Sequence, residues 1–206
     1  TADVPPVRRI WPTPRRLALW TGALVLILSL AVAAVGVRTD LPARLGDAFF
    51  IAQLGALLAI AVVSATLALR ASVPGEEPSL RVSGAVILLS TAALAMAFGR
   101  EPAATSPGSN FVAVGWPCAT ATVMIAALPL VLLAVALRRA APLVPTVAGL
   151  LAGGAAFFAA AAALQLVCPL DERWHLLVWH LGPVALGLVA SAALGAIWLS
   201  RWRRAS

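Results

Sequence analysis

The residues best suited to chemistry in this 206-residue chain are its two cysteines, Cys118 and Cys168. Two thiols can close a disulfide when their Cβ atoms lie about 3.5 to 4.5 Å apart. Reduced thiols can instead bind a soft metal ion such as Zn, Cd or Cu(I). His175, Asp171 and Glu172 lie close to Cys168 in sequence and are candidate further ligands. The alternative is that each cysteine is a small, inert, buried residue.

Few other side chains suggest a reaction. No Walker, Rossmann, HExxH, GxSxG or CxxC pattern occurs in the sequence. The long apolar runs contain no Lys, Arg, Asp or Glu, although ion-coupled transporters usually place one there. Gln53, Gln165 and His180 remain as polar candidates. We assign these three first to hydrogen-bonded packing, with a ligand role for His180 as the alternative.

Membrane helices are the elements that must position these residues. Hydrophobic residues make up 62% of the chain and charged residues 11%, which excludes a water-soluble fold. A helix needs about 20 apolar residues to cross a bilayer, and it satisfies its own backbone hydrogen bonds there. The predicted spans cover residues 17–37, 48–69, 82–99, 116–137, 143–167 and 175–199. The expected fold is an all-α membrane protein, a bundle of six transmembrane helices.

The arginines predict the orientation of this bundle. Cytoplasmic loops carry the excess of basic residues, and eleven of the fifteen arginines fall on the side that holds both chain ends. We therefore place both ends in the cytoplasm, and we read the net charge of +7 as topology, not as a nucleic-acid footprint. The expected parts are a cytoplasmic segment (1–16), a transmembrane domain (17–199) and a basic cytoplasmic tail (200–206), with no soluble domain.

This topology brings the two cysteines to one membrane face. Cys118 opens the fourth span and Cys168 closes the fifth, so both sulfur atoms are expected at the outer face. They come close in space if these two helices are antiparallel neighbours. An oxidising outer compartment would then favour a disulfide between them.

Small residues predict a close contact between the last two helices. Apolar helices in lipid associate through close backbone approach, which glycine and serine permit. The residues with this spacing are Gly149, Gly153, Gly187, Ser191 and Gly195.

The first helix is expected to start at a proline. Thr13 and Pro14 suit its N-cap and its first helical position. Arg15 and Arg16 would then lie among the lipid headgroups.

Several short segments together resemble a known family. They are Pro6-Val7-Arg8-Arg9-Ile10, Trp116-Pro117-Cys118, Leu137-Arg138-Arg139-Ala140-Ala141-Pro142, a glycine-rich run at 148–154, Cys168-Pro169 and Trp179-His180. Their order, over nearly the whole chain, resembles that of the NrsF-type membrane-bound anti-sigma factors of bacteria. Such proteins usually have more residues ahead of the first segment, so the resemblance implies further sequence before Thr1.

The resemblance implies a regulator and not an enzyme. It implies a multi-pass protein of the bacterial inner membrane that holds an extracytoplasmic-function sigma factor at the cytoplasmic face. The partners are that sigma factor and membrane lipid, with no direct contact to nucleic acid; the oligomeric state stays open. The segment that binds the sigma factor falls on Val7, Arg8 and Arg9.

The resemblance also implies how the sigma factor is released under stress. The family's cysteines fall on Cys118 and Cys168, which would sense heavy metal or oxidant from the periplasm. No constitutive cofactor is implied, but a Zn, Cd or Cu ion is a possible signal, with His175 as a candidate third ligand. A helix shift would carry the signal to Arg138 and Arg139.

Two other functions would use the same cysteines. A membrane thiol-disulfide oxidoreductase commonly needs a second exchanging pair or a quinone site, and only two thiols exist here. A small heavy-metal permease would use Cys118, Cys168 and His180. It would also need soft ligands deeper in the spans, where no further cysteine is present.

Overall fold

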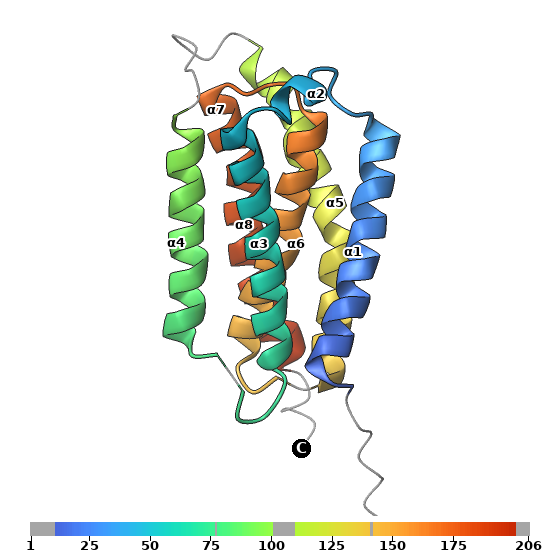
Figure 1. The fold of residues 1–206 in the computed structure, drawn as a ribbon. Coiled ribbons are helices and arrows are strands. Elements are labelled where there is room, and N and C mark those ends of the chain that lie inside the picture. Colours follow the sequence, from blue (N-terminus) through green and yellow to red (C-terminus); the bar gives the residue numbers. More distant parts are fainter. Residues whose placement is uncertain (1–10, 77, 101–109, 141, 201–206) are drawn as a thin grey trace, which may run out of the picture.

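The protein is a bundle of membrane-length helices without a strand in the part that the structure describes (Figure 1). The computed structural model describes residues 11–76, 78–100, 110–140 and 142–200. Within these residues, six helices are long and apolar enough to cross a membrane. They are α1 (Thr13–Val35), α3 (Ala48–Arg70), α4 (Leu80–Phe98), α5 (Phe111–Ala140), α6 (Pro145–Val167) and the composite span Arg173–Leu199. The predicted all-α fold of six spanning helices is confirmed.

Short segments complete the chain between and within the spans. A single turn, α2 (Leu41–Arg44), connects α1 to α3. The last span consists of α7 (Arg173–His175), η1 (Leu176–Leu181), α8 (Gly182–Leu194) and η2 (Gly195–Leu199), of which η1 and η2 are π-helical.

The bundle is built around α6, which lies in its middle between α1 and α4 at opposite edges (Figure 1). Small side chains dominate α6, including five consecutive alanines at positions 159–163. In the most apolar stretch of α6, 94% of the residues are buried, compared with 11% in α1 and 17% in α4. Small side chains let neighbouring helices approach α6 closely on every side. The outer helices α1 and α4 therefore leave most of their surface to lipid.

The predicted close contact between the last two spans is confirmed. Gly149 of α6 and Gly195 of η2 approach so closely that a Cβ on Gly149 would lie 2.8 Å from the Cα of Gly195. A Cβ on Gly153 would lie 2.6 Å from the Cβ of Ser191. No larger residue fits at this crossing without moving a backbone, which explains why the sequence places small residues there.

The start of α1 differs from the prediction. Pro12, and not Thr13, is the N-cap, and Thr13 is already helical. The hydroxyl oxygen of Thr13 accepts a hydrogen bond from Arg16 Nη2 at 3.2 Å, so it caps no backbone N–H group. Arg16 also donates to Ser72 Oγ at 2.9 Å, which ties the start of α1 to the chain just after α3.

Several spans are longer than predicted. α5 begins at Phe111, five residues before Trp116, and continues through Arg138 and Arg139 to Ala140. The prediction ended the fourth span just before Arg138, an ionisable residue. Arginine is nonetheless a good helix former, and its long side chain can reach the headgroups from within a helix.

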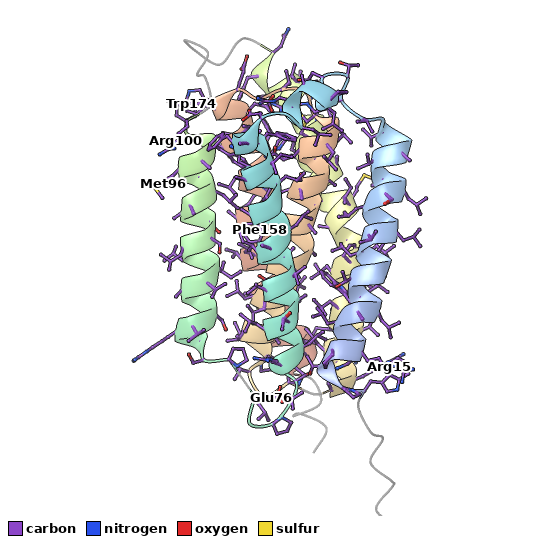
Figure 2. The ribbon with its side chains drawn as sticks, in the orientation of Figure 1. Arg15, Glu76, Met96, Arg100, Phe158 and Trp174 are labelled. Atoms are coloured by element: carbon purple, nitrogen blue, oxygen red, sulfur yellow. The ribbon has the colours of Figure 1, made fainter. Side chains whose placement is uncertain are left out.

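The two ends of the bundle are distinct. Arg15 and Glu76 lie at one end, which we call the proximal end, and Arg100 and Trp174 lie at the other, the distal end (Figure 2). α1 begins and η2 finishes at the proximal end (Figure 1). The arginine distribution predicts that this end faces the cytoplasm.

Candidate functional site

The two cysteines meet at the distal end of the bundle. Cys118 lies two turns into α5, and Cys168 is the C-cap of α6. The two helices are antiparallel neighbours, so the start of one meets the end of the other. Both thiols are free, and their Sγ atoms are 3.6 Å apart. The structure therefore brings together the pair that the topology predicted to be near.

A histidine joins this pair from the last span. The segment 169–172 leads directly from Cys168 into α7, which carries His175. The Nε2 atom of His175 lies 3.4 Å from Cys168 Sγ, and its side chain is buried. His175, a candidate ligand from the sequence, is thus within reach of any ion that Cys168 binds.

A second histidine, His180, is added by the π-helical segment η1. Backbone bonds in a π-helix run from residue i to i+5, so residues five apart lie on nearly one face. In an α-helix the same two residues would be about 140° apart around the axis. The rings of His175 and His180 meet edge to face, with their centroids 5.2 Å apart. Pro183 follows η1, and since it has no N–H group it cannot donate the α-helical bond to Trp179.

Four potential metal ligands therefore converge. One donor atom from each of Cys118, Cys168, His175 and His180 lies within 4.8 Å of all the others. Three of these side chains are buried, and Cys118 is half-buried. Both ring nitrogens of His180 are buried and have no hydrogen-bond partner in the described part of the chain. Buried polar atoms are normally paired with a hydrogen-bond partner, so the two ring nitrogens of His180 are exceptions among the described residues.

An ion-pair clamp holds the loop that carries Cys168. The side chain of Arg38, fully buried after α1, donates to both carboxylate oxygens of Asp40 at 2.7 and 2.8 Å. It also donates to Asp171 Oδ1 at 3.0 Å, and its backbone N–H donates to Leu166 O at 3.0 Å. Arg44 of α2 pairs with the same Asp171. The clamp therefore joins the end of α1 to residues that precede and follow Cys168 in the sequence.

Within the clamp, pairing favours the charged forms of Arg38 and Asp40. Hydrogen bonds from Arg38 lower the pKa of the Asp40 carboxyl. Hydrogen bonds to Asp40 and Asp171 raise the pKa of the Arg38 guanidinium above its usual range. Asp171, a candidate ligand from sequence, is therefore occupied by arginines, and neither it nor Glu172 belongs to the four-donor group.

The residues predicted to transmit the signal lie at the far end of α5. Arg138 and Arg139 are about 30 Å from Cys118 along the helix, at 1.5 Å per residue. The guanidinium of Arg138 stacks over the ring of Trp198 at 4.5 Å. Arg139 lines an open groove of about 750 Å³ between α1 and α5. The predicted sigma-binding residues Val7, Arg8 and Arg9 lie outside the described residues.

Sequence reasoning placed His180 in packing before ligation and did not find the clamp. The useful signal was Pro183, because a proline three residues after a histidine disturbs the α-helical register. For Arg38 the only signal was an arginine close to Asp40 in the short segment between the first two spans. Nothing local indicated that this arginine would be buried.

Comparison with known proteins identifies one family. The family model described as NrsF, negative regulator of sigma F, matches residues 1–202. No curated protein matches the chain. No solved structure matches it either.

Proposed function

The chain belongs to the NrsF family of negative regulators of sigma F, and from this premise we propose that its cysteine pair controls the release of an extracytoplasmic-function sigma factor. Membership of the family makes the protein a negative regulator with a sigma factor as its partner. The proposal adds an inner-membrane location, binding at the cytoplasmic face through Val7, Arg8 and Arg9, and no catalytic activity.

One observation carries the sensing part of the proposal: two free thiols, distant in sequence, lie 3.6 Å apart. A disulfide bond is about 2.05 Å long, so the two sulfurs need to approach by only about 1.5 Å. The proximity therefore favours a pair that reacts as one unit over two inert residues.

Oxidation and metal binding are the two events that the pair can report. Hydrogen peroxide would take two electrons and two protons from the thiols, forming one S–S bond and two molecules of water. A soft metal ion would instead displace both thiol protons and bind the two thiolates, with His175 as a further ligand. Either event joins α5 to the end of α6.

A change at this junction has a route to the proximal end. Packed helices move between discrete arrangements, and they do not deform continuously. A shift of α5 against α6 would displace Arg138 and Arg139, the residues we propose for signal transmission. The sigma factor would be released when these residues and the amino-terminal segment no longer form one continuous binding surface for it.

The test is a reporter gene under the cognate sigma factor, in cells that produce the full chain. We expect the native chain to repress the reporter until Cd²⁺ or peroxide is added. Cys118→Ser and Cys168→Ser should still repress but should lose induction at least about tenfold. Ala119→Ser, a serine placed beside Cys118, is the matched control and should respond as the native chain does. Full induction in the double cysteine variant would contradict the proposal.

A further inference from the structure

We infer that Cys118, Cys168, His175 and His180 form one binding centre for a divalent, four-coordinate, thiophilic cation, the class represented by Zn²⁺ and Cd²⁺. The inference rests on the proposed function in one respect, because it assigns a ligand class to the same cysteine pair. It adds His180 as a full ligand, and it makes metal binding a property that can be measured without the sigma factor.

The spacing of the donors fits a tetrahedral ion. Zn²⁺ binds thiolate sulfur at about 2.3 Å and imidazole nitrogen at about 2.0 to 2.1 Å. For tetrahedral angles these lengths place two sulfurs about 3.8 Å apart, and a sulfur and a nitrogen about 3.6 Å apart. The observed distances are 3.6 Å from Cys118 Sγ to Cys168 Sγ and 3.4 Å from Cys168 Sγ to His175 Nε2. Two of the six donor–donor distances therefore already match such a tetrahedron to within about 0.2 Å, and the other four are at most 4.8 Å.

His180 is the observation that distinguishes a metal centre from a simple dithiol. A disulfide would need neither histidine. Yet His180 is almost wholly buried, its donor atom belongs to the four-donor group, and neither of its ring nitrogens has a hydrogen-bond partner among the described residues. A cation held by Cys118 and Cys168 would give the imidazole a partner. The π-helical turn that brings His180 beside His175 is itself an irregularity often found at functional sites.

Charge selects the class of cation. Each thiol loses one proton when it binds a metal, so two thiolates carry a charge of −2 and two neutral imidazoles add none. A divalent ion makes the centre neutral, which suits a buried site, whereas a monovalent ion would leave a net negative charge there. Arg38 and Arg44, which hold the loop after Cys168, are already paired with Asp40, Asp47 and Asp171.

The experiment uses the full chain purified in detergent under a reductant that contains no thiol. Co²⁺ is the probe, because tetrahedral cobalt with thiolate ligands gives intense visible and charge-transfer absorption, and Zn²⁺ should then displace it. We expect one Co²⁺ per chain with the tetrahedral spectrum. His180→Gln should lose that spectrum and bind at least about a hundredfold more weakly, beyond the usual effect of a residue that only orients a ligand.

Controls keep the result interpretable if a variant folds poorly. Ser191→Ala changes a buried residue of the same span away from the donors, and it should bind Co²⁺ as the native chain does. His175→Gln provides a second ligand variant. Zn²⁺ should raise the Tm of the native chain and of Ser191→Ala, but it should raise neither histidine variant to the same extent.

The outcomes separate this inference from the proposed function. If the native chain binds no Co²⁺ or Zn²⁺, or if His180→Gln binds both as tightly as the native chain, the four-ligand centre is wrong. In that case a cysteine-dependent response to peroxide would still support the proposed function. Conversely, tight metal binding together with an unchanged reporter response in the cysteine variants would support the centre and contradict the proposed function.

Discussion

The guanidinium of Arg38 donates hydrogen bonds to both carboxylate oxygens of Asp171, three residues after Cys168. Arg38 follows α1, whereas Asp171 precedes α7, so this contact joins two parts of the chain that are 133 residues apart. The position of Cys168 therefore depends on the end of α1 as well as on α6. The candidate sensor and the first helix are mechanically linked.

Arg38→Gln should loosen this link. Removing one partner of a buried ion pair costs about 3 to 5 kcal/mol, but the side chains of Asp40 and Asp171 are 45% and 23% exposed. We therefore expect the free energy of unfolding in detergent to fall by about 1 to 3 kcal/mol. Cys118 and Cys168 should also form a disulfide more slowly with diamide, as followed by thiol alkylation. Arg100→Gln, an exposed arginine near the same end, is the control. Equal disulfide rates in all three proteins would contradict the role of the clamp.

Gly195→Ala should destabilise the bundle. A Cβ at this position would lie 2.8 Å from the Cα of Gly149, and neither backbone can move without separating two helices. We expect a loss of about 1 to 3 kcal/mol, the usual cost of overpacking. Gly84→Ala is the matched control, because nothing lies within 4 Å of its added Cβ. That change should be neutral or stabilising by up to about 1 kcal/mol, since alanine is the better helix former. Thermal unfolding of both variants checks the contrast.

Pro183→Ala should separate the two histidines. The new N–H group can donate an α-helical bond to the carbonyl of Trp179, which removes one reason for the π-helical turn. His180 would then rotate away from His175 as η1 becomes α-helical. We expect tetrahedral Co²⁺ binding to weaken at least tenfold without loss of helix content in circular dichroism. An unchanged cobalt spectrum would show that the proline does not set the register of His180.

Arg138→Gln combined with Arg139→Gln should uncouple the two ends of the protein. Arg138 stacks on Trp198, and Arg139 lines the groove between α1 and α5. If these residues transmit the signal, induction of the reporter should fall at least fivefold while Cys118–Cys168 disulfide formation stays unchanged. Arg70→Gln, at the end of α3 on the same side, controls for lost positive charge. Normal induction in the double variant would place the transmission route elsewhere.

The sequence predicts the spans and the meeting of the cysteines for a simple physical reason. Both follow from the length of hydrocarbon that a helix must cross, and antiparallel helices of similar length must bring the start of one beside the end of the next. The spacing of glycine and serine, which includes Gly149 and Gly195, also predicted the contact between the last two spans correctly, because close approach of helices requires small residues.

The details that the sequence did not predict depend on contacts between distant segments. His180 joins the site only because η1 departs from α-helical periodicity, and the prediction assumed that periodicity throughout. Asp171 was a candidate ligand until Arg38 and Arg44, from another part of the chain, proved to hold it. The helix starts at Thr13, one residue before Pro14, and Pro14 stays in the first turn, where its missing N–H group breaks no helical hydrogen bond.

The run of alanines in α6 has a mechanical consequence. Alanine has no side-chain torsion angle to change, so this part of α6 cannot accommodate a displacement by switching its own rotamers. A push on α6 at Cys168 must therefore move the helix as a rod. Its opposite tip, where Gly149 touches Gly195, is where such a movement would first meet resistance.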